Sequence, residues 1–198
     1  MKIQDDPHPK PSCKKVYDHD KIELLIKNYD ASLNEWKRYQ YWNPKEEYTR
    51  NLIATDNKHF TLMLLCWNPK MGSPIHNHSG CDCFMRIIKG EIIETRYVYP
   101  KDDKFHKKIV EAGSVDDGKW SGLDVIQESK LVEGDVRWIN DMMGVHKMEN
   151  EHEVEGSVTM HCYIPPYAVC HTFEKKKDGK MEIEESEMSY ATEHGNIK

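Results

Sequence analysis

The chain has 198 residues, of which 38% are hydrophobic and 31% charged, so it can form one domain with a buried core and hardly two. This composition excludes a disordered tail and a fibrous protein. The formal net charge is −6 at pH 7, and a mildly acidic surface repels phosphates, which argues against nucleic acid as a partner. No apolar run approaches the roughly 20 residues of a membrane span, and the N-terminal sequence MKIQDDPHPKPSCKK lacks the apolar segment of a signal peptide. We therefore expect a cytoplasmic protein that contacts neither nucleic acid nor a membrane.

The cysteines favour the same compartment. In a reducing cytosol free thiols are expected rather than disulfides, and no CxxC zinc motif occurs. Three of them, Cys66, Cys162 and Cys170, are most simply buried small hydrophobic residues. The six cysteines are Cys13, Cys66, Cys81, Cys83, Cys162 and Cys170.

Residues from about 18 to 55 are predicted to be helical. The segment Lys21–Tyr29 repeats apolar residues at the spacing of one helix face. Ser32 followed by Glu35 forms a capping box that predicts the start of a second short helix. Asn43-Pro44 predicts a third, since proline suits the first position of a helix.

Residues from about 57 to 184 are predicted to be β-structure, because short runs rich in β-branched and aromatic residues alternate with glycine turns. Lys89-Gly90, Glu133-Gly134 and Asp178-Gly179 are predicted to be hairpin turns, the last being the strongest signal. The expected runs are His59–Trp67, Cys83–Ile88, Glu91–Tyr99, Leu131–Val132, Val136–Ile139, Val158–Tyr163 and Met181–Ile183.

This pattern predicts a mainly β protein, in which a single domain spans residues 1–198 and short N-terminal helices precede a small barrel or jelly roll. The polar segment Glu184–Lys198 is expected to fray. The lysine run Lys175–Lys177 is expected to be a solvated hairpin flank.

A metal site is predicted at His76-Asn77-His78. Residues two apart on a strand point to the same face, so both imidazoles could reach one ion. An isolated HxH pair is weak evidence by itself, and a third ligand must come from elsewhere. The candidate is His146, which follows the predicted strand Val136–Ile139.

The arrangement of these residues resembles the two sequence motifs of the cupin superfamily. The first motif runs through Gly72, His76, His78, position 83 and Gly90, and the second through Gly134, His146 and Asn150. The second motif is one residue longer than the usual pattern and lacks its proline. The resemblance implies a jelly-roll β-barrel that holds a metal. Where the usual cupin has a glutamate ligand, this chain has Cys83.

Asp82 is an alternative ligand. Strict strand alternation from His76 through His78 would turn Asp82 toward the metal and Cys83 away from it, giving two histidines and one carboxylate. The cupin register favours Cys83, which requires a bulge or turn near Ser79-Gly80.

Cys83, the segment Thr159–Pro166 around Tyr163, and the upstream sequence Tyr48-Thr-Arg50-Asn together resemble the cysteine dioxygenase family. The likeness extends from about the second predicted helix to His171. It implies that His76, His78 and His146 bind Fe(2+), and that a thioether joins Cys83 to Tyr163 as a protein-derived cofactor. Motif spacing does not identify the metal, because imidazole also binds zinc and nickel.

The resemblance also implies the remaining site residues. The family's relay falls on Thr159, His161 and Tyr163, with threonine where the family has serine. Its substrate-binding arginine falls on Arg50, with Tyr48 beside it. Trp67 and Cys170 match positions that flank the pocket. Without the resemblance, Arg50 would more simply lie on a solvated face.

The expected activity is addition of both atoms of O₂ to the thiol of L-cysteine, giving cysteine sulfinic acid, a step of cysteine catabolism and taurine biosynthesis. Three neutral imidazoles leave the metal its full double charge, which favours an anionic thiolate, and Arg50 can pair with the substrate carboxylate. The alternatives are a dioxygenase for cysteamine or 3-mercaptopropionate, and a metal-binding cupin without catalysis. We expect a monomer.

Overall fold

The computed structural model describes residues 17–100, 123–177 and 181–198. The helical elements in these ranges are α1 (His19–Lys27) and the 3-10 turns η1 (Ala31–Leu33), η2 (Glu35–Tyr39) and η3 (Asp141–Met143). The strands are β1 (Tyr48–Thr55), β2 (Thr61–Trp67), β3 (Ile75–His76), β4 (Asp82–Lys89), β5 (Glu91–Tyr97), β6 (Val125–Val132), β7 (Val136–Ile139), β8 (Val145–Glu149), β9 (Ser157–Ile164), β10 (Val169–Lys175), β11 (Met181–Glu187), β12 (Thr192–Glu193) and β13 (Asn196–Ile197).

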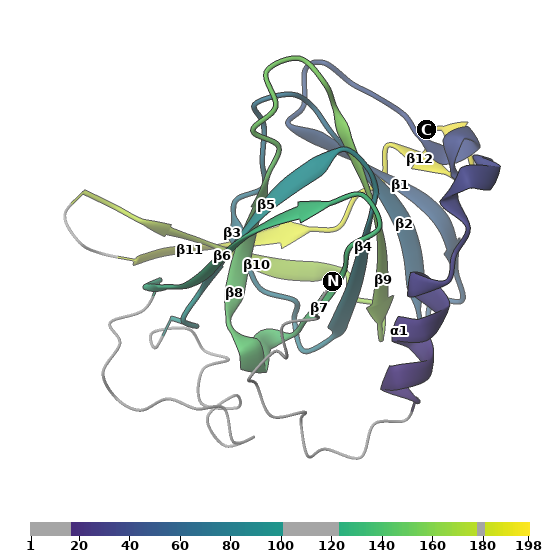
Figure 1. Ribbon diagram of the computed structural model, residues 1–198. Coiled ribbons are helices and arrows are strands. Elements are labelled where there is room, and N and C mark those ends of the chain that lie inside the picture. Colours follow the sequence, from purple (N-terminus) through teal and green to yellow (C-terminus); the bar gives the residue numbers. More distant parts are fainter. Residues whose placement is uncertain (1–16, 101–122, 178–180) are drawn as a thin grey trace.

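Two sheets form the walls of a barrel (Figure 1). The seven-stranded sheet has the order β13-β12-β1-β2-β9-β4-β7, and the six-stranded sheet has the order β11-β10-β3-β8-β5-β6. The chain crosses between the sheets several times, as in a jelly roll. The mainly β barrel with short helices before it, predicted from the sequence, is therefore confirmed.

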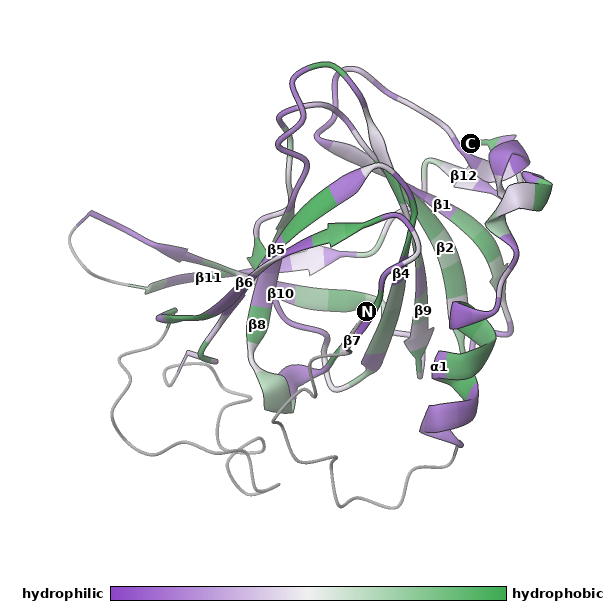
Figure 2. Ribbon diagram, viewed as in Figure 1, coloured by the Kyte–Doolittle hydropathy of each residue, from purple (hydrophilic) through white to green (hydrophobic). Residues whose placement is uncertain are grey.

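Strand β9 shows that the seven-stranded sheet packs against a hydrophobic cluster on each of its two faces. All eight of its residues are buried, because its side chains alternate between the barrel interior and the layer beneath the helices. Tyr163 packs in the interior cluster with Cys83, whereas Met160 and Cys162 pack in the outer cluster with Trp36. Figure 2 shows the hydrophobic residues along β2, β4 and β9.

Helix α1 is fixed at both ends against the outer face of this sheet. The Asp18 carboxylate accepts a hydrogen bond from the Lys21 amide at 3.1 Å, which caps the N-terminus. At the C-terminus, the Arg86 guanidinium of β4 donates to the carbonyls of Ile26, Lys27 and Tyr29 at 2.9, 2.8 and 2.5 Å. A cation among the last carbonyls of a helix is electrostatically favourable.

The predicted helical region ends too late. The helical elements before the barrel stop at Tyr39, and Tyr48–Thr55 is strand β1, paired with β2 and β12. Asn43-Pro44 forms a turn instead of starting a helix, since the Asn43 side chain accepts from the Lys45 amide at 3.1 Å. The capping box at Ser32 is also wrong, because Asp30 caps η1 and Ser32 lies inside it.

Two of the three predicted hairpins are wrong. Lys89-Gly90 joins β4 to β5, and Glu133-Gly134 joins β6 to β7, yet in each case the two strands belong to different sheets. A tight glycine turn has the same local sequence whether the chain returns along its own sheet or crosses to the facing one. Asp178-Gly179 lies outside the described residues, but the flanking strands β10 and β11 pair antiparallel over seven positions.

The C-terminal segment is ordered rather than frayed. Strand β12 pairs parallel with β1, and β13 pairs with β12. The Thr192 hydroxyl donates to the buried Asn51 side chain at 3.1 Å. Tertiary pairing of this kind is invisible to a composition argument.

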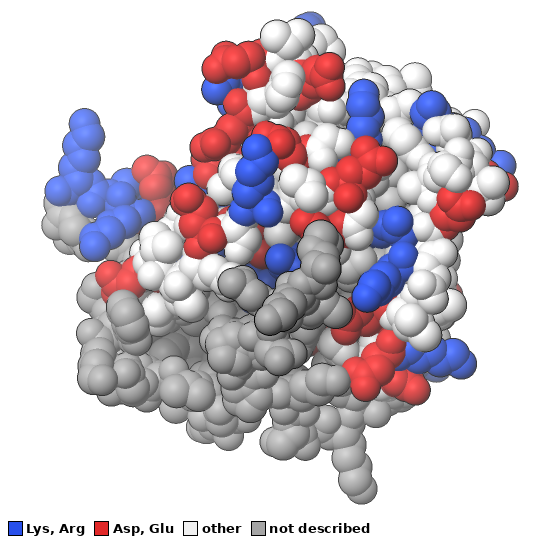
Figure 3. Space-filling view, viewed as in Figure 1, with Lys and Arg blue, Asp and Glu red and all other residues white. Residues whose placement is uncertain are grey.

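Charged side chains of both signs are interspersed over the face shown in Figure 3. In the predicted lysine flank, Lys176 pairs with Glu174 at 2.8 Å and with Glu182 of β11 at 2.5 Å. The five cysteines of the described ranges are buried and unpaired. None of the helices in those ranges is long and apolar enough to cross a membrane.

Candidate metal centre and active site

Three histidines meet at the inner face of the six-stranded sheet. His76 ends β3, His78 follows two residues later, and His146 lies on β8 directly opposite His76 in the strand register. Their ring centroids are 4.8 to 5.3 Å apart, and one ligand atom from each lies within 4.8 Å of the others. This cluster of His76, His78 and His146 could bind one metal ion.

The ring nitrogens fit a metal. Nδ1 of His76 lies 3.0 Å from the Pro74 carbonyl and Nδ1 of His146 lies 2.8 Å from the Glu94 carboxylate, so each ring donates there and keeps Nε2 as a free donor atom for a metal. His78 is fully buried, and within the described part of the chain neither of its nitrogens has a hydrogen-bond partner. A buried polar group without a partner is costly unless something binds it.

All three imidazoles are held in the neutral form. Burial lowers the pKa of His76 to about 4. Burial, with the neighbouring histidines, lowers the pKa values of His78 and His146 well below the usual value. A metal-binding imidazole must be neutral, so the protein presents its ligand set without needing to release protons near pH 7.

The loop that carries His78 is held by a carboxylate. Asp141 accepts from the amides of His78 and Gly80, both at 2.7 Å. Asn77, between the two histidines, points to the other side and accepts from the His171 amide at 2.8 Å. Gly72 allows the segment before β3 to approach β8, since a Cβ there would lie 2.7 Å from the Met148 carbonyl oxygen.

Cys83 faces Tyr163 and not the solvent. The two residues are direct partners in the antiparallel register of β4 and β9, and both are buried. Directly opposed side chains have Cβ atoms about 4.5–5.5 Å apart, within reach of a thioether. Burial raises the pKa of the Cys83 thiol, although a hydrogen bond with Tyr163 opposes the shift.

Asp82, the alternative ligand, lies elsewhere. Its carboxylate accepts hydrogen bonds from the Tyr17 hydroxyl and from the Asn140 side chain, the latter at 2.7 Å. It is not part of the histidine cluster.

A chain of hydrogen bonds runs behind the pocket from Trp67 to Tyr163. The Trp67 indole donates to the Thr159 hydroxyl at 2.8 Å, and that hydroxyl lies 2.7 Å from Nε2 of His161. Nδ1 of His161 lies 3.4 Å from the Tyr163 hydroxyl. An indole N–H can only donate, so the single hydrogen of Thr159 is best satisfied by donating to His161.

Because Thr159 donates to His161, the positions of the hydrogens on His161 and Tyr163 follow. Nε2 of His161 accepts, so its hydrogen is on Nδ1 and points to the Tyr163 oxygen. Burial lowers the pKa of His161 to about 3 and raises that of Tyr163 well above its usual value. Both rings are therefore neutral, and His161 does not use the phenol hydrogen of Tyr163, which can point to the Cys83 sulfur or into the pocket.

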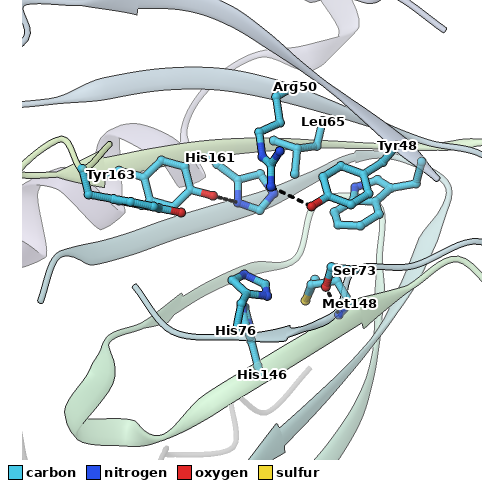
Figure 4. Close-up of a pocket in the computed structure, with 11 residues that line it drawn as sticks. Tyr48, Arg50, Leu65, Ser73, His76, His146, Met148, His161 and Tyr163 are labelled. Atoms are coloured by element: carbon cyan, nitrogen blue, oxygen red, sulfur yellow. Dashed lines mark hydrogen bonds between the residues drawn. The ribbon is translucent and has the colours of Figure 1, made fainter. Parts of the chain in front are cut away.

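The pocket lies between the two sheets (Figure 4). Arg50, Tyr48 and Tyr163 reach it from the seven-stranded sheet, and His76 and His146 face them from the six-stranded sheet. The Arg50 guanidinium donates to the Tyr48 hydroxyl at 2.7 Å and lies 5.0 Å from the centre of its ring. The pocket therefore places a guanidinium opposite the histidine cluster.

Most of the predicted site residues meet here, and some lining residues were missed. Cys170 is buried on β10 and is not among the residues that line the pocket. Met148 and Leu65 are two residues from His146 and Trp67 on the same strand faces, so alternation could have found them. No sequence pattern indicated that Tyr167 would line the pocket. The lining residues are Tyr48, Arg50, Leu65, Trp67, Ser73, His76, His146, Met148, His161, Tyr163 and Tyr167.

The sequence is similar to proteins of one known family. Residues 12–176 match the model of the family cysteine dioxygenase type I. The chain is 30% identical over 164 residues to cysteine dioxygenase type 1 of Homo sapiens, covering 83% of this chain and 74% of the relative. It is 31% identical over 157 residues to cysteine dioxygenase type 1 of Danio rerio, covering 79% and 70%. A solved protein of Klebsiella pneumoniae with a double-stranded β-helix domain is 14% identical, with a TM-score of 0.44, covering 77% of this chain and 88% of that one.

Proposed function

The chain belongs to the cysteine dioxygenase type I family, and on this premise we propose that it is an iron(II) enzyme that adds both atoms of O₂ to the thiol of L-cysteine, giving cysteine sulfinic acid. The observation that carries the proposal is the pocket in which a guanidinium, that of Arg50, faces three neutral histidines. This arrangement can bind the carboxylate of a small amino acid at one end and its sulfur at the other.

His76, His78 and His146 would hold the metal. Iron(II) bound there would supply a redox-active centre that can bind a thiolate and O₂, and the electrons that reduce O₂ come from the sulfur, which is oxidised from thiol to sulfinate. Among the residues that the structure describes, no carboxylate belongs to the histidine cluster, so this ligand set adds no negative charge. The site therefore favours an anionic substrate.

Arg50 would bind and orient the substrate carboxylate. A guanidinium offers two parallel N–H donors that match a carboxylate, which fixes both the position and the rotation of the substrate. Its hydrogen bond to Tyr48 at 2.7 Å and the ring contact hold the guanidinium in place before substrate arrives. Tyr48 itself stacks on Trp67, with ring centroids 4.5 Å apart.

Tyr163 would donate its phenol hydrogen into the pocket. The hydrogen-bond chain from Trp67 through Thr159 and His161 does not use that hydrogen and restrains the ring. In the crosslinked protein the Cys83 thiol no longer competes for it. Tyr167 packs edge-on against Tyr163, with centroids 5.2 Å apart, and lines the pocket beside it.

A Cys83–Tyr163 thioether is part of the proposal. Forming it removes the thiol hydrogen and one ring hydrogen, so it is an oxidation for which O₂ is the available oxidant. The opposed register of the two residues and their complete burial support it. The crosslink would fix the phenol more firmly than hydrogen bonds alone. We also propose a cytoplasmic monomer.

The test is O₂ consumption by the iron-loaded protein with L-cysteine, cysteamine and 3-mercaptopropionate in parallel, with the sulfinate identified by mass spectrometry. We expect turnover with L-cysteine, because it has both a carboxylate for Arg50 and an amine beside the thiol. Preferred turnover of either other thiol would change the substrate but keep the chemistry. No uptake with any thiol, from protein shown to contain Fe(II), would leave a cupin that only binds metal.

A further inference from the structure

A buried ion pair lies behind one of the three histidines. Glu94 and Arg96 are two residues apart on β5 and point to the same face, beneath His146 of β8. The Glu94 carboxylate oxygen Oε1 lies 2.8 Å from Nδ1 of His146 and 3.3 Å from Nε of Arg96. All three side chains are at most 3% exposed. The Arg96 guanidinium also donates to the Trp138 carbonyl at 3.2 Å.

The ion pair makes the three imidazoles unequal. His76 donates to a neutral carbonyl, and the nitrogens of His78 have no partner within the described ranges, whereas His146 donates to a carboxylate. A carboxylate acceptor fixes the orientation of the ring and increases the basicity of its other nitrogen. His146 is thus the strongest electron donor of the cluster.

The charges add a second effect. Glu94 alone would place a full negative charge one imidazole away from the metal, similar to the carboxylate ligand that the cluster lacks. Arg96 contacts the same carboxylate and cancels that charge. The pair therefore orients and activates His146 while leaving the ligand environment without net negative charge.

We propose that Glu94 and Arg96 are positioning residues that act on the metal through His146: Glu94 increases the affinity for Fe(II) and lowers the Fe(III)/Fe(II) potential, and Arg96 offsets Glu94 so that the site still attracts a thiolate. The identity of the metal and of the thiol rests on the proposed function. The two residues act in opposite directions on the potential.

Glu94→Gln keeps the shape and an oxygen acceptor for His146 but removes the charge. We expect a 10- to 100-fold weaker affinity for Fe(II), measured by competition with a chelator, and a more positive Fe(III)/Fe(II) potential. Arg96→Met removes the compensating charge with little change in volume. We expect a more negative potential and a higher KM for cysteine with a smaller change in kcat.

The opposite signs distinguish this role from a purely structural one, because loosened packing would shift both variants the same way. Shifts of equal sign, or potentials and affinities unchanged in both variants, would overturn the inference. Glu91→Gln is the matched control, since Glu91 lies on the same strand but pairs with Lys130 at the surface. Its affinity and potential should equal those of the wild type.

Removing one partner of a buried ion pair can prevent folding, so a second pair of variants keeps the test decisive. Arg96→Lys retains the charge and should retain the wild-type potential. Glu94→Gln combined with Arg96→Met removes both charges, and should recover the wild-type KM while the affinity for Fe(II) stays low. A high KM in the double variant would contradict the charge argument. The affinity for Fe(II) and the potential are measured without cysteine. Their outcome therefore tests the roles of Glu94 and Arg96 independently of whether the protein oxidises thiols.

Discussion

Arg50→Ala tests the carboxylate site most directly. Arg50 is partly buried in the pocket and held by Tyr48 at 2.7 Å, so a bound carboxylate would be shielded from water by Trp67 and Tyr167. Truncating one partner of such a hydrogen-bonded charge pair costs about 3 kcal/mol or more, because the other charge is left unpaired. Since about 1.4 kcal/mol is a factor of ten, kcat/KM for cysteine should fall by roughly 150-fold, mostly through KM.

Substrate and variant controls separate binding from folding. Cysteamine has no carboxylate, so its kcat/KM should change little in Arg50→Ala. Tyr48→Phe removes one hydrogen bond to the guanidinium but keeps the cation. It should weaken the binding free energy of cysteine by about 1 kcal/mol, which raises KM roughly fivefold. Arg86→Ala removes a half-buried arginine outside the barrel, and should lower Tm without changing KM.

The assay is initial O₂ uptake over a range of cysteine concentrations, with the iron content of each variant measured. A KM for cysteine within threefold of the wild type in Arg50→Ala would refute the assigned role. So would an equal loss for cysteine and cysteamine, because the defect would then lie in the metal site or the fold.

Three further predictions concern the crosslink, the metal-binding loop and the buried imidazoles. Cys83→Ser should abolish a faster-migrating band in denaturing gels, together with the mass loss of two hydrogens; a band that persists would exclude this thioether. Asp141→Asn keeps the shape but weakens the acceptor for the His78 and Gly80 amides, so the affinity for metal, measured by chelator competition, should fall about tenfold; an unchanged affinity would contradict a role for Asp141 in holding the loop. Metal-free protein should lose stability as the pH falls from about 6.5 toward 3, because burial lowers the pKa of His161 to about 3 and the unfolded chain then binds a proton that the folded chain does not. At pH 5 His161 alone lowers the free energy of unfolding by about 2 kcal/mol. Tm should therefore fall between pH 7 and 5, and it should fall less steeply in His161→Gln. Equal slopes of Tm against pH in the two proteins would contradict this account.

The sequence was sufficient for strands β2, β4, β5, β7 and β9 and for the histidine cluster, but not for β8 and β10, which were not among the expected runs. Runs such as β4 and β9 are long and apolar enough to be recognised, and the spacing of His76, His78 and His146 matches a known motif. It was insufficient for β1, whose start was mistaken for a helix after Asn43-Pro44. It was also insufficient for β12, which exists only because β1 offers it an edge.

The residues that support the site were harder to predict than the residues that form it. Glu94 and Arg96 lie two apart on a strand that was predicted, so a charged pair on an inward face was a usable signal. Their partner His146 comes from another strand, however, and the pairing of β5 with β8 could not be read from either segment. Asp141 holds the loop at His78 from 63 positions away in the sequence.

Within the described ranges, the absence of a carboxylate from the histidine cluster depends on one turn. Along an unbroken strand, Asp82 would share a face with His78. Instead Ser79 and Gly80 have positive φ values of 50° and 81°, and the Cys81 amide bonds back to the His78 carbonyl at 3.0 Å. This turn shifts the alternation by one residue, so the Asp82 carboxylate is bound outside the cluster and Cys83 faces Tyr163. The same turn therefore determines both the charge of the ligand set and the position of the thiol, which is why alternation alone could not decide between the two residues.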